Sequence, residues 1–159
     1  MDGFGRTIKV ETGDGSGTKS VAETEYDSCA CSPLGKLKRS SRPYAPGGTP
    51  VWTTYTYDAL GRTISVVAAD GASTSTYSYS GNTVTSTDPA GKWKKMTLDA
   101  MGELTKVTEP NPAGGADLDT LYTYNALGKL VQVSMTRSGT TQLRTFSYDT
   151  QGRGILTAG

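Results

Sequence analysis

The chain has 159 residues, no histidine and a formal net charge of +1, and Leu, Val, Ile and Phe make up only about 16% of it, less than the ~20% expected of a conventional core. The lack of histidine excludes Ser-His-Asp and Cys-His catalysis, histidine metal ligands and a histidine pH switch. The near-zero charge argues against a nucleic-acid surface, and no apolar run approaches the ~20 residues that span a bilayer.

The abundant residues predict an all-β fold. Thr occurs 25 times, Gly 20 times, Ser 15 times and Tyr 9 times. Thr and Tyr favour strands, whereas Gly favours turns. We therefore expect antiparallel β-hairpin repeats stacked into a curved or spiral sheet, with about a dozen strands, a thin apolar core and no helix.

One phrase recurs along the chain: an aromatic residue, any residue, Tyr, an acid or amide, two residues, Gly and a basic residue. Complete copies span residues 55–62 (YTYDALGR), 122–129 (YTYNALGK) and 146–153 (FSYDTQGR). Partial or diverged copies lie, in chain order, at residues 2–6, 26–36, 77–82, 88–92 and 98–103. Such internal repetition predicts stacked units that bury their faces against one another.

The second half of the phrase predicts a turn. Asp or Asn at the first position and Gly at the fourth suit a type I turn followed by a bulge, which returns the chain as a hairpin. The predicted structural turn residues are Asp58 and Gly61, Asp88 and Gly91, Asp99 and Gly102, Asn125 and Gly128, and Asp149 and Gly152.

The first half of the phrase predicts a strand that carries two aromatic rings on one face, because side chains alternate along a strand. The expected aromatic ladder comprises Tyr55, Tyr57, Tyr77, Tyr79, Tyr122, Tyr124, Phe146 and Tyr148. We interpret these rings as the packing of the sheet, while the alternative is a platform that stacks on sugar rings.

Other turn-forming residues fit the same arrangement of hairpins. Asp70-Gly71 and Gly81-Asn82 each separate two alternating segments and predict short hairpin turns. Segments rich in Pro and Gly predict loop insertions near residues 27–50 and 109–117. Since the repeat continues across both insertions, we expect a single domain over residues 1–159.

Few residues suggest chemistry. Cys29 and Cys31 are compatible with two unpaired thiols, a disulfide or a metal site, although a structural zinc site needs four ligands. The basic run 92–95 suits a solvated strand better than a nucleic-acid groove. Asp117 and Asp119 could be a calcium or hydrolase pair, but no calcium-loop pattern follows them. We expect no catalytic residue, metal or cofactor, and not an enzyme.

The repeated Tyr-x-Tyr-Asp-x-x-Gly-Arg phrase resembles the YD repeat of the Rhs and teneurin superfamily, from residue 2 to residue 153. The resemblance implies a long β-strand spiral that closes into a hollow shell, which in bacteria often encloses a toxic region and in animals belongs to an adhesion receptor. It also implies a secreted or cell-surface location, here bacterial. Only Asp88-Pro89-Ala90-Gly91 matches the family's Asp-Pro-x-Gly self-cleavage phrases, so no catalytic residue is carried over.

The functional hypothesis is a non-enzymatic YD-repeat scaffold. With about a dozen strands, the chain is too short to close a shell, and it shows no signal peptide. We therefore expect either a fragment of a larger shell or a structure that assembles as a filament or ring through open strand edges. The expected partners are copies of itself or the rest of a shell. The alternative is an adhesion module that binds carbohydrate or protein through its Tyr faces and Pro/Gly loops.

Overall fold

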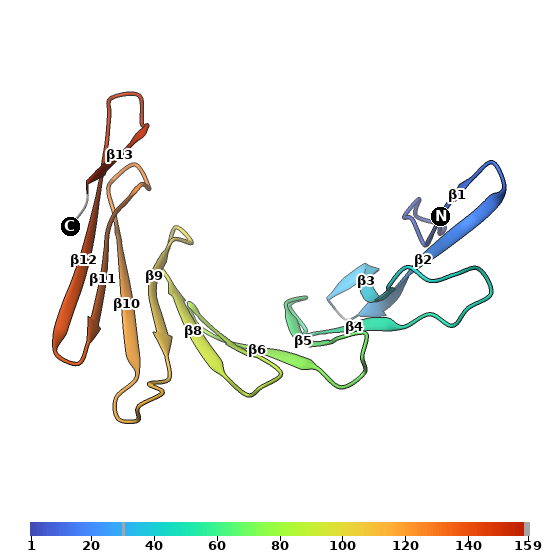
Figure 1. Ribbon diagram of the computed structural model, residues 1–159, viewed down its shortest axis with the longest axis horizontal. Coiled ribbons are helices and arrows are strands. Elements are labelled where there is room, and N and C mark those ends of the chain that lie inside the picture. The colour runs from blue at the N-terminus through green and yellow to red at the C-terminus, as the bar shows by residue number, and fades with distance from the viewer. Residues whose placement is uncertain (30, 158–159) are drawn as a thin grey trace. The chain divides into compact units, whose positions relative to one another are not determined.

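The computed structural model describes residues 1–29 and 31–157, and these form thirteen β-strands and no helix (Figure 1). Each range below gives the first and the last residue of a strand. The strands are β1 (Lys9–Asp14), β2 (Gly17–Cys29), β3 (Ser32–Ser41), β4 (Trp52–Tyr57), β5 (Thr63–Val67), β6 (Thr74–Ser80), β7 (Thr83–Thr87), β8 (Trp93–Leu98), β9 (Leu104–Glu109), β10 (Leu118–Tyr124), β11 (Leu130–Arg137), β12 (Thr140–Tyr148) and β13 (Gly154–Thr157).

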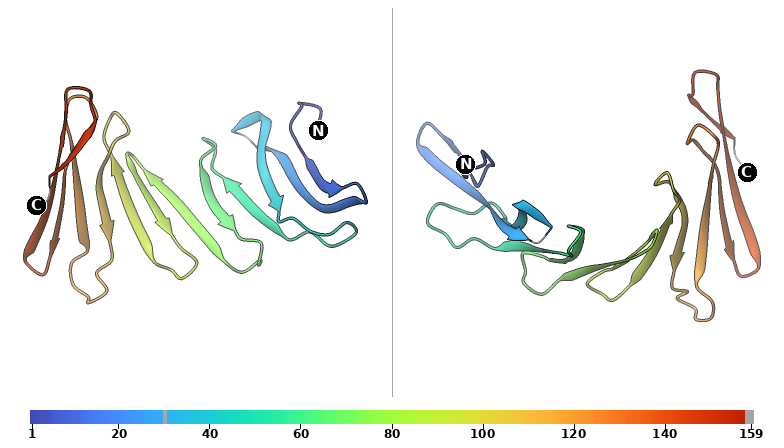
Figure 2. Two further views of the ribbon diagram at one scale, coloured as in Figure 1. Left: turned by 45° about the horizontal axis from the view of Figure 1, so that its top comes forward. Right: turned by 180° about the vertical axis from the view of Figure 1, so that it is seen from behind.

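The strands belong to two compact units, one over Met1–Tyr77 and one from Ser78 onward, with the boundary inside β6. Within each unit the strand order follows the chain order, and neighbouring strands run antiparallel. In the second unit, β10, β11 and β12 lie side by side in every view (Figures 1 and 2). The predicted all-β class of antiparallel hairpins is confirmed, whereas the single domain over 1–159 stays a prediction.

Little of either unit is shielded from water. Among the residues whose burial is described, those that are buried are Val21, Val107 and Thr120, which are 4%, 8% and 6% exposed. In the second unit, Val107 pairs with Met96 on one side and Thr120 on the other, which places them in one row across β8, β9 and β10. In the second unit, the thin core expected from the composition is therefore a line of side chains on one face of the sheet.

The turn at Asp70-Gly71 differs from the two-residue hairpin that the sequence suggested. A type I′ turn needs a positive φ at both central residues, but only Gly71 has one, at 71°. Instead, Ala68 and Ser73 close a wider turn in which Asp70 Oδ1 accepts the N–H groups of Ala72 and Ser73. Hydrogen bonds from Ser73 and Ala72 lower the pKa of Asp70 to about 2.

The expected loop insertion near residues 27–50 is partly strand. β2 continues to Cys29 and β3 covers Ser32–Ser41, with Gly35 at a φ of 75° inside a bulged stretch of the ladder. The bulge absorbs the irregularity that Pro33 and Gly35 introduce, so pairing resumes at Lys36. The loop proper covers residues 42–51, and the second insertion is a loop between β9 and β10.

The hairpin predicted at Gly81-Asn82 is confirmed, since β6 ends at Ser80 and β7 begins at Thr83. No part of the described chain folds into an apolar helix of membrane-spanning length.

Candidate functional site

The repeat turns share one hydrogen-bond pattern. Asp58 Oδ1 accepts the N–H groups of Leu60 and Arg62 at 3.0 and 2.9 Å, and the Asp58 carbonyl accepts the Gly61 N–H at 2.9 Å. Gly61 has a φ of 78°, a conformation that a side chain would strain. The same three bonds are made by the turns that begin at Asp2, Asp58, Asp88, Asp99, Asn125 and Asp149.

An ion pair within the turn adds to this pattern where the fifth residue is Arg. Asp58 Oδ2 accepts a hydrogen bond from Arg62 Nε at 2.7 Å, and Asp149 accepts one from Arg153 at the same distance. The hydrogen bond from the backbone N–H of the Arg, together with its side chain, holds the pKa of each Asp carboxyl below its usual range. These carboxylates are therefore committed to the turn and are not arranged for catalysis.

The second Tyr of the phrase joins neighbouring strands through its hydroxyl. Tyr57 donates a hydrogen bond to the carbonyl of Leu37 at 2.8 Å, from β4 to β3. The equivalent bonds run from Tyr124 to Leu104 at 3.0 Å and from Tyr148 to Leu130 at 2.7 Å. Burial raises the pKa of Tyr57 and Tyr124. The sequence indicated that these rings share a face, but it did not indicate this hydroxyl contact.

A basic side chain from the preceding repeat reaches over the same ring. Lys36 Nζ lies 5.0 Å from the ring centroid of Tyr57 and donates to the Gly61 carbonyl at 2.6 Å. Lys129 Nζ lies 5.0 Å from the Tyr148 ring and donates to the Gly152 carbonyl at 2.8 Å. We call the Tyr hydroxyl bond and this cation contact, taken together, the inter-repeat latch. It fixes one turn against the next turn of the same sheet edge.

The first turn carries a variant of the cation contact. Arg6 lies 4.0 Å from the ring centroid of Tyr26 and donates to the carbonyl of Leu34 at 2.7 Å. The basic residue after the turn glycine thus has a role that sequence reasoning missed. The sequence feature that could have indicated this role is the regular recurrence of a basic residue after Gly, at Arg6, Lys36 and Lys129.

Glu103 stands where the other latches have a cation. It follows Gly102, and its carboxylate lies so close to the next turn that a Cβ added at Gly128 would come 2.7 Å from Oε1. Burial and the neighbouring Asp99 carboxylate raise the pKa of the Glu103 carboxyl. The negative charge of Glu103 also contributes to the raised pKa of Tyr124, after burial. This latch therefore retains the Tyr124 hydroxyl bond and places an acid where a donor is favourable.

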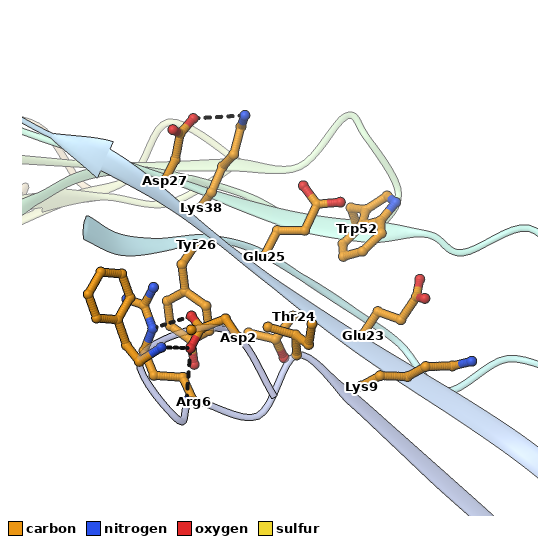
Figure 3. A pocket seen from close by; sticks show the side chains of 13 residues that line it. Asp2, Arg6, Lys9, Glu23, Thr24, Glu25, Tyr26, Asp27, Lys38 and Trp52 are labelled. Carbon is orange, nitrogen blue, oxygen red and sulfur yellow. Dashed lines mark hydrogen bonds and ion pairs between the residues drawn. The ribbon is translucent and has the colours of Figure 1, made fainter. Parts of the chain in front are cut away.

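A groove of about 650 Å³ lies in the first unit, between the Asp2–Arg6 turn and the strands β2 and β3 (Figure 3). Its walls include the rings of Phe4, Tyr26 and Trp52. Charged side chains in and beside the groove form ion pairs: Asp2 with Arg6 at 2.6 Å, Asp27 with Lys38 at 2.9 Å, and Glu25 with Arg39 at 2.6 and 2.7 Å.

Arg39 also lies 4.2 Å from the Trp52 ring centroid. Hydrogen bonding to Arg39 lowers the pKa of Glu25, and hydrogen bonding to Lys38 lowers the pKa of Asp27. The groove therefore offers aromatic faces and charged groups most of which are held in ion pairs. Such a surface suits an uncharged polar ligand better than an ion.

Cys29 and Cys31 are joined by a disulfide with a Cα–Cα distance of 5.1 Å, one of the three states that the sequence left open. It lies at the β2–β3 connection, and a Cβ added at Gly61 would come 3.4 Å from the Cβ of Cys31. Across residues 1–29 and 31–157, no three Cys, Asp or Glu side chains gather as they would around a metal ion.

The other candidates for chemistry take structural roles. Lys94 pairs with Glu109 at 3.0 Å, and Lys95 lies 5.0 Å from the Trp93 ring centroid. Asp119 accepts hydrogen bonds from Lys106 and Thr108 on the neighbouring strand β9. The Lys94–Glu109 and Asp119 contacts tie adjacent strands together, whereas Lys95 and Trp93 belong to the same strand, and neither group is arranged for phosphate or calcium.

A family model, the teneurin YD-shell, matches residues 45–158. Similar solved structures are a Tc holotoxin pore from Photorhabdus luminescens, a TcdB2-TccC3 complex without its hypervariable C-terminal region, and a TcdB2-TccC3-Cdc42 complex. Each is 14% identical to the chain, with TM-scores of 0.41, 0.43 and 0.43 respectively. Each match covers 93% of this chain but only 10% of the other. A search of curated proteins returns no match.

The latch predicts a selective effect of removing a Tyr hydroxyl. We expect Tyr124→Phe and Tyr148→Phe each to lower the free energy of unfolding by about 0.5–1.5 kcal/mol, the net contribution of a typical hydrogen bond. The matched control is Tyr122→Phe, because the described chain offers the Tyr122 hydroxyl no acceptor. Urea denaturation followed by circular dichroism measures the difference. Equal losses in all three variants would contradict the latch.

The latch that has Glu103 in place of a cation predicts that the free energy of unfolding of the second unit depends on pH. Because the pKa of Glu103 is raised in the fold, its ionisation opposes folding, so its contribution to stability falls as the pH rises through 4.5 and the raised pKa. We expect Glu103→Lys to stabilise the second unit at pH 7 by supplying the missing donor. Glu103→Gln should remove only the pH-dependent part of the contribution that residue 103 makes to the free energy of unfolding.

The control for this prediction is the reverse exchange, Lys129→Glu, which should destabilise the same unit at pH 7. The measurement is urea denaturation of each variant between pH 4 and pH 8. If Glu103→Lys were less stable than wild type at pH 7, the assignment of this position to the latch would be wrong.

Proposed function

Because the chain belongs to the teneurin YD-shell family, we propose that it is a non-enzymatic wall segment of a β-shell, and that the wall is extended by adding strands to an open edge of its sheet. The observation that carries this proposal is the inter-repeat latch, which stabilises a turn only when the next turn lies beside it. A sheet of this kind gains from each added neighbour, as repeat arrays do.

The open edge that we propose for extension is β1. Its six residues are all exposed, and it stands at the end of the strand order of the first unit. The Ile8 carbonyl accepts the Thr24 N–H, so the backbone groups of Ile8 point toward β2. By alternation, those of Lys9 and Glu11 point away from β2 and are placed to pair with an incoming strand.

The proposed partners are copies of this chain or the remaining strands of a longer shell, and the proposed location is secreted or cell-surface. Family membership supports both proposals, and the open edge supports the proposed partners. Edge strands with unpaired backbone groups are templates for pairing with another strand.

Glu11→Pro tests the role of the edge. Proline removes the outward N–H of Glu11, and that N–H makes no bond to β2, so the first unit should still fold. We expect the wild-type chain to form larger species with increasing concentration in sedimentation velocity, and Glu11→Pro to suppress them. The matched control Glu11→Ala loses the same charge and should assemble as wild type does. A wild-type chain that stays monomeric throughout would contradict assembly through this edge.

The groove supports a second candidate function, a binding module for uncharged glycans. Trp52 and Phe4 line it, and most of its charged groups are held in ion pairs that still offer hydrogen bonds to hydroxyl groups. Aromatic faces combined with such polar groups are suited to sugar rings, since flat rings bury large apolar areas.

Tryptophan fluorescence tests this candidate, because the chain has two Trp residues and only Trp52 lines the groove. We expect a panel of neutral oligosaccharides to shift the emission of the Trp93→Phe variant, which reports on Trp52 alone. The same panel should leave the Trp52→Phe variant unchanged. If no oligosaccharide shifts the emission of Trp93→Phe, the groove is not a glycan site.

A further inference from the structure

The disulfide of the first unit lies in residues that lengthen one repeat turn. Seven residues separate Asp27 from Gly35, whereas two residues separate Asp58 from Gly61 in the next repeat. Gly35 and Gly61 have nearly the same positive φ, 75° and 78°, so the end of the turn is alike in both. Because the shorter turn reverses the chain without a disulfide, the fold does not require one at this position.

The disulfide adds little constraint to the strands that it joins. Cys29 ends β2 and is already paired in the ladder with Ser32, the first residue of β3. The two cysteines are separated by two positions in the sequence, and the stabilisation that a cross-link gives falls as the closed loop becomes shorter. Cys29 and Cys31 are also partly exposed. The bond can therefore be reached by a thiol, and its opening leaves the β2–β3 pairing in place.

A cation lies beside one end of the disulfide. A Cβ added at Gly61 would come 3.3 Å from Lys36 Nζ and 3.4 Å from the Cβ of Cys31, so both groups surround the same glycine. Lys36 Nζ donates to the Gly61 carbonyl and contacts the Tyr57 ring, and within the described part of the chain no carboxylate forms an ion pair with it. Its charge is therefore available to an anion that forms at Cys31, and a neighbouring lysine favours thiolate over thiol.

We propose that the Cys29–Cys31 disulfide is an exchange site for a dithiol reductant. A thiolate of the dithiol attacks Cys29 Sγ and forms a mixed disulfide, while the Sγ–Sγ bond breaks and its electron pair leaves on Cys31 Sγ, beside Lys36. Cys31 is the leaving group because the more stable thiolate leaves faster.

The second sulfur of the reductant completes the exchange. As a thiolate, it attacks the reductant's own sulfur in the mixed disulfide and releases Cys29 as a thiolate. The dithiol loses two electrons and becomes a disulfide, the chain's disulfide gains them and becomes two cysteines, and the two protons of the dithiol pass to water or to the released sulfurs.

Reduction acts on the inter-repeat latch through Lys36. The full negative charge of a Cys31 thiolate attracts the ammonium group more strongly than the dipole of the Gly61 carbonyl does, so the contact between Lys36 and the next turn weakens. The chain has no other cysteines, and the Lys129 latch therefore has no such partner. The redox state of the disulfide thus controls one latch of the first unit, and this control does not depend on assembly through β1.

The rate of reduction by dithiothreitol tests the role of Lys36. We expect Lys36→Gln to slow reduction by about threefold or more, and Lys36→Arg to keep the wild-type rate, because it keeps the charge. The matched control is Lys38→Gln, since Lys38 is already paired with Asp27 at 2.9 Å, and it should also keep the wild-type rate. A purely structural Lys36 would predict the opposite, because its loss would expose the disulfide. An unchanged or faster rate in Lys36→Gln would overturn the proposal.

The position of attack is tested on the wild-type chain, so this test does not depend on the folding of a variant. Reduced glutathione, a monothiol, is added briefly, the reaction is stopped with acid, and free thiols are alkylated with N-ethylmaleimide. We expect tandem mass spectrometry to find glutathione on Cys29 and the maleimide on Cys31. Equal labelling, the reverse order, or a disulfide that reacts only in urea would each contradict the proposal.

Hydrogen exchange tests the effect on the latch at about pH 8, where a cysteine beside a lysine is ionised. On reduction, we expect the amides of residues 58–62 to exchange about threefold faster or more, and those of the Lys129-latched turn 149–153 to stay unchanged. The variant Cys29→Ser/Cys31→Ser has neither disulfide nor thiolate, so it should exchange as the oxidised chain does. If this variant exchanges as fast as the reduced chain, loss of the bond and not the thiolate loosens the turn, and control through Lys36 is wrong.

Discussion

The structure depends on a contact that crosses from one repeat to the next. Each unit is built from antiparallel strands with few buried side chains, so a strand cannot rely on a globular core for stability. The Tyr hydroxyl bonded to the neighbouring strand and the cation over its ring supply a substitute. Both groups are partly shielded from water, where hydrogen bonds and cation–π contacts are stronger than at a fully exposed surface.

The latch also explains why the turn is so regular. For Lys36 or Lys129 to reach the next glycine carbonyl, that carbonyl must lie at a fixed height and orientation above the ring. The Asp or Asn side chain fixes it by holding two N–H groups of its own turn, and glycine provides the positive φ. Turn geometry and strand packing are thus one constraint, because an altered turn would misplace the acceptor of the neighbouring latch.

The sequence predicted the parts of this arrangement that are local. The turn residues and the shared face of Tyr55 and Tyr57 follow from residue preferences and from the period of two along a strand. The latch joins residues about twenty apart, and single-residue preferences carry no information on such pairs. The strand over residues 32–41 was missed for a related reason: Pro33 and Gly35 are typical of loops, but here a bulge accommodates them inside the ladder.

Most recurring positions within the repeated phrase have a structural role in the fold, and the position before the glycine does not. Asp, Gly, Tyr and the basic residue are each used by the turn or by the latch, whereas the residue before the glycine is used by neither. Ala90 and Gln151 occupy that position without altering the turn, so a large apolar side chain there is free to serve contacts outside the unit. In a sheet that buries so little of its own surface, contacts between neighbouring strands are the main source of burial. A repeat of this kind is therefore organised around its neighbours, and its stability grows with the number of strands stacked beside it.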